Sequence, residues 1–147
     1  MQVAAWHEFA SEAPELAQFA QERLGQAPSY LATVRADGWP RVHPVGPLTP
    51  RDGQLVVVMY PTSPKGQDLR RNAQFALHAS VEGQLGGEVL LTGQGQPTEP
   101  SETDIASGYI AFALLIGEIL ATRYDELGLN PSRERWRADG SQTDRSR

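Results

Sequence analysis

A proline- and glycine-rich segment at residues 61–72 separates two apolar runs and limits how the chain can fold. The run Leu55–Tyr60 precedes this segment and the run Phe75–Ser80 follows it, and each has the length and composition of a buried strand. Prolines lack a backbone N–H and glycine weakens a strand, so the first strand must end at this segment. Residues 67–72 then favour a short helix. The sequence therefore predicts a strand, a loop, a short helix and a second strand in that order.

The same segment places polar groups where its short helix begins. Ser63 supplies a hydroxyl and Lys65 an ammonium group, and helix starts and turns of this kind bind anions, phosphate above all. The chain has a formal net charge of −5, so the cationic residues Lys65, Arg70 and Arg71 form a positive island in an acidic protein. The alternative is a solvated basic turn between two strands. These residues alone leave both interpretations open.

Length and composition set outer limits on function. The 147 residues predict one domain, residues 1–147, that is large enough for a hydrophobic core. Net acidity argues against nucleic acid as the main partner, and the absence of cysteine excludes disulfides and thiolate chemistry. The longest apolar run, Ile110–Ile116, is too short to cross a membrane. We therefore expect a cytoplasmic protein with neither a nucleic-acid nor a membrane partner.

The first part of the chain, residues 3–24, has helical periodicity with its apolar side chains on one stripe. Ser11 suits an N-cap, and Pro14 suits the first turn of a helix, where its missing N–H costs least. We therefore predict two short helices that are broken near Ser11, the second of which ends at Gly25.

From Ser29 onward the pattern changes to short strands separated by turn residues. The expected strands are 30–35, 39–48, 55–60, 75–81, 88–96, 112–116 with 118–124, and 133–137; a short helix starts at Ser101, and 138–147 forms a polar tail. Asp37-Gly38 is a strong hairpin signal, and Pro44 and Pro47 put the second strand at an edge or a bulge. Roughly six to seven short antiparallel strands predict a mainly β fold, a closed or half-closed β-barrel with a few short helices.

Two glycines and three histidines could belong to a nucleotide-binding loop or to a metal site. Gly93 and Gly95 suggest a nucleotide-binding loop, but no long helix follows them, so we interpret them as a bulge or a close backbone approach. The three histidines share no ligand spacing, so we expect no metal site. No set of nucleophile, base and orienting group stands out, and the catalytic residues stay unknown. In the last strand, alternation puts Trp136 on the face opposite to Arg135 and Arg137.

Several motifs between Tyr30 and Gly95 occur in a characteristic order. They are LATVRADGWPRVHPV at 31–45, DGQL at 52–55, and SPK followed by DLRRN within 63–72, and the ending RWR at 135–137 belongs with them. This order resembles the pyridoxamine 5′-phosphate oxidase-like family of FMN-binding split barrels. The resemblance implies an antiparallel split barrel that forms a homodimer, with its flavin sites at the interface.

The resemblance also implies cofactor contacts. Arg41 would pair with the FMN phosphate, and Ser63 and Lys65 would complete the phosphate cradle. The other implied contacts are Val42, His43, Pro44 and Val45 along the ring edge, largely through backbone groups, Val58 and Met59 along the flavin, and Trp136 if the last strand reaches the ring. A guanidinium fork and an ammonium point charge from different elements suit a phosphate dianion.

The expected function is therefore that of an FMN-binding oxidoreductase that passes hydride or electrons between the flavin and a small organic substrate. Pyridoxamine phosphate is not the expected substrate, because the chain lacks the longer C-terminal portion that carries the substrate-binding arginine and histidine in relatives with that activity. The alternatives are a reductase that uses the deazaflavin F420 and a non-catalytic protein that binds flavin or haem. The apolar runs Leu55–Met59 and Phe112–Ile116 favour a homodimer, because they exceed what one small barrel obviously buries.

Overall fold

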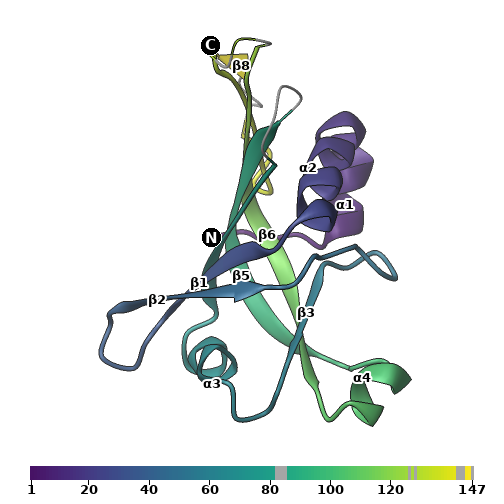
Figure 1. Ribbon diagram of the computed structural model, residues 1–147, viewed down its shortest axis with the longest axis vertical. Helices are drawn as coiled ribbons and strands as arrows, with labels where there is room; N and C mark the ends of the chain where they lie inside the picture. The colour runs from purple at the N-terminus through teal and green to yellow at the C-terminus, as the bar shows by residue number, and fades with distance from the viewer. Residues whose placement is uncertain (82–85, 126, 128, 142–144, 147) are drawn as a thin grey trace.

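The computed structural model describes residues 1–81, 86–125, 127, 129–141 and 145–146. The described strands are β1 (Ser29–Val34), β2 (Pro40–Val45), β3 (Val56–Met59), β4 (Gln74–Val81), β5 (Gly87–Thr98), β6 (Ile110–Arg123), β7 (Ser132–Arg137) and β8 (Arg145–Ser146). All of their pairings are antiparallel. The expectation of a mainly β, antiparallel fold is confirmed, and Figure 1 shows the strands as a long twisted sheet with the short helices beside it.

The order of the strands leaves the barrel open on one side. The sheet runs β2–β1–β4–β5–β6, and the two halves of β6 have different further partners. β3 pairs with Ile110–Ala113 and β7 with Glu118–Arg123. No pairing within the described residues joins β2 to β3. These two strands therefore form the two sides of the split, with α3 (Pro64–Arg71) lying between them (Figure 1).

Two helices cover one face of the sheet. α1 (Trp6–Glu12) packs against β6, and α2 (Pro14–Gln26) packs against β4 and β5. The break lies at Ala13, not at Ser11, which belongs to α1. Ala13 needs no capping side chain here, because its own N–H bonds to the carbonyl of Phe9 and Pro14 starts α2 with its fixed φ.

The helix predicted from Ser101 is α4 (Glu102–Ala106), which is shorter than expected. The Ser101 hydroxyl accepts a hydrogen bond from the Asp104 N–H, and the Asp104 carboxylate accepts one from the Ser101 N–H. This reciprocal pair satisfies two backbone donors that the helix leaves free. The predicted bulge is also present, as a register shift between Thr92 and Gly93.

Three sequence-based expectations need correction. The apolar run at 112–116 is mostly internal, with Phe112, Leu114 and Ile116 each at most 1% exposed, so it is not spare surface for a dimer. The run Phe75–Ser80 was expected to be a buried strand, but the side chain of His78 within it is 43% exposed. The tail at 138–147 is partly ordered, because Arg145–Ser146 pairs with β7; residues 142–144 and 147 lie outside the described part of the chain. Among the described residues, no helix is long and apolar enough to cross a membrane.

Candidate functional site

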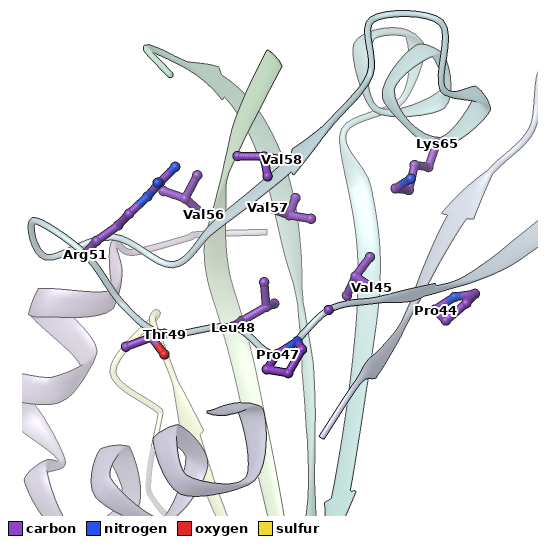
Figure 2. A pocket seen from close by; sticks show the side chains of 11 residues that line it. Pro44, Val45, Pro47, Leu48, Thr49, Arg51, Val56, Val57, Val58 and Lys65 are labelled. Atoms are coloured by element: carbon purple, nitrogen blue, oxygen red, sulfur yellow. The ribbon is translucent and has the colours of Figure 1, made fainter. Parts of the chain in front are cut away.

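A cleft lies in the split of the barrel, between the end of β2 and β3. Its volume is about 380 Å³, within the range of clefts that hold small molecules. The lining residues are Pro44, Val45, Gly46, Pro47, Leu48, Thr49, Arg51, Val56, Val57, Val58 and Lys65. Figure 2 shows Lys65 at one end and Arg51 at the other, with apolar side chains between them. The cleft therefore suits a ligand with an apolar body and an anionic end.

The cation at one end of the cleft comes from the start of α3. Ser63 is the N-cap and Pro64 the first helical residue, so the helix starts three residues before the predicted range of 67–72. The Ser63 side chain makes no capping bond; its hydroxyl accepts a hydrogen bond from Lys65 Nζ at 2.9 Å. Burial lowers the pKa of Lys65 below its ordinary value. The Lys65 ammonium is thus partly desolvated, which strengthens its attraction for an anion.

The rest of α3 is tied to the sheet through a buried carboxylate. Asp68 is 1% exposed and accepts hydrogen bonds from Thr33 Oγ1 at 2.8 Å, Arg41 Nε at 2.7 Å and Arg71 Nη2 at 2.9 Å. Burial would raise the pKa of Asp68, but these hydrogen bonds and the two arginine charges outweigh it and hold the pKa below its usual value. Asp68 is therefore an anion that binds Arg41 of β2 and Arg71 of α3, the helix that also carries Lys65 at one end of the cleft.

His43 lies on β2, two residues after Arg41 and two before Val45, which lines the cleft. Its Nε2 is shielded from solvent and has no hydrogen-bond partner. Burial, followed by the charges of Lys65 and Arg41, lowers the pKa of His43, against a smaller opposing effect of Asp68. A buried polar atom without a partner is costly, so a hydrogen bond between this nitrogen and a bound ligand would remove that cost.

Acidification is expected to destabilise the ligand-free protein through His43. The pKa of His43 is lower in the folded chain than its ordinary 6.5, so the unfolded chain binds more protons as the pH falls through 6.5. The free energy of unfolding should fall over this range until the pH reaches the lowered folded value. The variant His43→Gln should lose less stability than wild type between about pH 8 and about pH 5.5 in urea unfolding. Equal losses in the two proteins would contradict this account.

The structure brings most of the predicted site residues together. Pro44, Val45, Val58 and Lys65 line the cleft, and Ser63 contacts Lys65. Arg41 is held to Asp68 on α3, the helix that carries Lys65, and His43 lies two residues after Arg41 on β2.

Three predicted residues lie elsewhere in this chain. Met59 is 3% exposed and points into the barrel, where its Sδ packs against Gly66 of α3. Val42 is 63% exposed on the opposite face of β2. Trp136 is buried beside Phe9, with ring centroids 4.9 Å apart, and its Nε1–H bonds to Glu12 of α1. A flavin contact for these three residues stays a prediction.

Sequence reasoning missed the two buried aspartates of the site. Asp68 was not recognised as a site residue, although its spacing to Arg71 is that of an i,i+3 helix pair. Asp104, which is 8% exposed, accepts a hydrogen bond from Arg51 Nη2 at 2.7 Å and so holds the cation at the far end of the cleft. The helical spacing could have indicated the first pair, but no local pattern indicated the second.

No family model and no curated protein sequence matches the chain. Solved structures do. PhzG from Burkholderia lata 383, in complex with tetrahydrophenazine-1-carboxylic acid, has a TM-score of 0.65 at 15% identity, over 95% of this chain and 89% of that one. HutZ, the haem storage protein from Vibrio cholerae, has a TM-score of 0.53 at 20% identity, over 71% and 89%. A FAD-binding protein from Mesorhizobium loti has a TM-score of 0.55 at 16% identity, over 70% and 91%.

These neighbours define the class of fold. They are split-barrel proteins of the pyridoxamine 5′-phosphate oxidase-like type. At these identities the likeness shows the fold alone. The chemistry must therefore be argued from the cleft and the side chains around it.

Proposed function

We propose that the chain binds FMN in the cleft between β2 and β3 and acts as an oxidoreductase on a small organic substrate. One observation carries the proposal: an apolar cleft of about 380 Å³ ends at Lys65, beside Arg41 and the unpartnered Nε2 of His43. Both the apolar body and the cationic end match the flat ring and the phosphate of this cofactor. The flavin- and haem-binding proteins among the structural neighbours support a cofactor of this size.

The charges near the Lys65 end of the cleft suit a phosphate dianion. Arg41, Lys65 and Arg71 supply three cations and Asp68 one carboxylate, which leaves two units of positive charge. In the proposed complex, Lys65 and Ser63 hold the phosphate from α3 and Arg41 holds it from β2. Donors from two different elements give both charge and direction.

The apolar lining would hold the ring system. Val45, Val57 and Val58 offer flat contact, and the backbone of β2 between Arg41 and Val45 offers hydrogen bonds to the ring edge. Bound flavin supplies reversible hydride and electron transfer, which no side chain provides. The chain's own part is to bind the phosphate, orient the ring and exclude water from one of its faces.

We further propose that the protein is a homodimer with its flavin sites at the interface. Exposed apolar side chains on the outer face of the sheet support this proposal: Tyr30 is 55%, Val42 63% and Leu90 38% exposed. Tyr30 pairs with Pro44 and with His78, and His78 pairs with Leu90, so these four residues form one row across β2, β1, β4 and β5. Val42 lies two residues before Pro44, on the same face of β2. A second copy would cover such a surface.

Two other functions use the same cleft. A reductase that uses F420 would also place a phosphate group and a flat tricycle there. A non-catalytic carrier of flavin or haem is the other, and HutZ, a haem storage protein, is among the structural neighbours. Reduced F420, FMN and haemin are therefore separate arms of the test below.

Titration of the cofactor-free protein with FMN and with riboflavin tests the proposal. FMN should bind at least about 100-fold more tightly than riboflavin, because only FMN carries the phosphate. Visible absorbance reports binding, and sedimentation equilibrium of the FMN complex should give the mass of two chains. Equal affinity for FMN and riboflavin would overturn the phosphate assignment. Tighter binding of F420 or haemin than of FMN would assign that compound as the cofactor in place of FMN. A mass of one chain would overturn the proposed dimer.

A further inference from the structure

We propose that Asp68 is a positioning residue for the anion site, one that aims the Arg41 guanidinium at the bound phosphate. The inference rests on the proposed function and adds a residue that does not itself touch the ligand. It assigns a role to a carboxylate that would otherwise count only as a buried ion pair. Three features of Asp68 support this role: its hydrogen bonds, the elements that these bonds join, and the negative charge of its carboxylate.

The hydrogen bonds fix the orientation of Arg41. Asp68 Oδ2 accepts from Arg41 Nε at 2.7 Å and also from Thr33 Oγ1 at 2.8 Å, while Oδ1 accepts from Arg71 Nη2 at 2.9 Å. The Nε edge of the guanidinium is thus occupied. Its two terminal nitrogens make no hydrogen bond to another described residue. The planar guanidinium therefore presents its remaining donors on the edge away from Asp68.

The same carboxylate joins the two elements that carry the phosphate ligands. Thr33 and Arg41 are direct partners in the β1–β2 register, and Asp68 reaches both from α3. α3 also carries Lys65, and it is anchored by Leu69, which is 2% exposed. Asp68 therefore sets the spacing between the guanidinium on β2 and the ammonium on α3. A phosphate that both cations bind requires this spacing to be kept.

The sign of the charge makes the proposal testable. Asp68 is an anion within the anion site, so its charge alone repels a phosphate. If charge were its only effect, removing it would strengthen binding. If Asp68 positions Arg41, removing it weakens binding although the site becomes more positive. If Asp68 only supports the fold, its loss weakens binding of FMN and riboflavin alike.

The experiment compares FMN and riboflavin affinities of wild type, Asp68→Asn and Thr33→Val. Asparagine keeps the shape and one acceptor but loses the charge that holds the guanidinium; valine keeps the shape of threonine and removes one bond to Asp68. We expect Asp68→Asn to lower FMN affinity about tenfold, and Thr33→Val about threefold, with riboflavin affinity unchanged in both. Circular dichroism confirms that each variant is folded before it is titrated.

Glu118→Gln is the matched control. Glu118 also contacts two arginines, on the half of β6 that pairs with β7: it forms an ion pair with Arg135 at 3.2 Å and accepts a hydrogen bond from Arg137 Nε at 2.9 Å. Its loss should leave both affinities unchanged. In ligand-free protein, the Arg41 Nε proton should exchange with solvent faster in Asp68→Asn than in wild type, which reports positioning without any cofactor.

Each outcome decides the matter. A wild type that does not prefer FMN to riboflavin overturns the proposed function and this inference together. A preference that is present in wild type and survives or increases in Asp68→Asn overturns only the inference. An equal fall in FMN and riboflavin affinity shows that Asp68 serves the fold, which also overturns it. Should Asp68→Asn not fold, Thr33→Val decides on the same criteria.

Discussion

The double variant Arg41→Ala/Lys65→Ala is expected to lose measurable FMN binding and to keep its binding of riboflavin. Each residue would contribute a charge-assisted hydrogen bond to the phosphate, and loss of one such bond costs about 1.5–3 kcal/mol, or roughly 10- to 100-fold in affinity. The two losses together amount to roughly 100- to 10,000-fold if they add. Riboflavin lacks the phosphate, so its affinity should change little. Fluorescence titration of each ligand measures the difference.

The single variants separate binding from stability. Lys65 lines the cleft and, within the described residues, makes one side-chain hydrogen bond, to the Ser63 hydroxyl, so Lys65→Ala should weaken FMN binding without unfolding the protein. Arg41→Ala also removes a donor from the buried carboxylate of Asp68, which costs about 1–3 kcal/mol of stability. Thermal unfolding of both variants should therefore distinguish them.

Arg70→Ala is the control for general loss of charge on α3. Arg70 lies on the exposed side of the same helix as Lys65 and carries the same charge. Its removal should change FMN affinity by less than about threefold, because exposed charges are screened by solvent and salt. An FMN affinity in the double variant equal to that of wild type would show that the phosphate binds elsewhere.

The strands could be predicted because their residues alternate between core and surface. In β1, Leu31 and Thr33 are buried and Tyr30 is exposed, as a period of two requires. The turns could also be predicted from their glycines, since Gly38 has φ of 87° and Gly53 has φ of 74°, values that favour glycine. Local steric rules thus determine much of the barrel, and local sequence is enough to detect them.

The errors arose where tertiary partners decide. The run Phe75–Ser80 has the composition of a buried strand, but β4 buries alternate side chains: Phe75, Leu77 and Ala79 are buried and His78 points outward. Trp136 was correctly placed opposite its neighbouring arginines, but nothing local indicated that Phe9 and Glu12 of α1 would receive it. Contacts between residues more than a hundred positions apart leave no local pattern.

The site was predictable in its cations and not in its anions. Arg41 lies near the start of β2 and Lys65 near the start of α3, and both are half-buried. Their charges can be recognised from the sequence alone. Asp68 is surrounded by Arg70 and Arg71 in the sequence and reads as a surface pair. Its burial depends on Thr33 and Arg41 of the β1–β2 hairpin, which precede it by 35 and 27 residues and meet α3 only in the folded chain.

Gly93→Ala is expected to be among the most destabilising single substitutions in the chain, at a cost of about 3 kcal/mol or more. A Cβ on Gly93 would fall well inside contact distance of the Leu115 carbonyl oxygen and 3.0 Å from the Gly117 nitrogen. These are backbone atoms of β6, which no rotamer change can move. Because β6 also pairs with β3 and β7, a shift of its backbone disturbs both halves of the sheet.

Two other glycines provide a graded comparison, because the atoms that meet an added Cβ differ. At Gly95 the Cβ would lie 3.1 Å from Leu69 Cδ2, the end of a side chain that can turn aside, so Gly95→Ala should cost about 1 kcal/mol. At Gly46 nothing lies within 4 Å, so Gly46→Ala should be nearly neutral. The melting temperature should therefore fall by roughly 10 °C for Gly93→Ala and by about 3 °C for Gly95→Ala. A melting temperature for Gly93→Ala within about 3 °C of wild type would show that β5 and β6 do not pair as closely as the bulge requires.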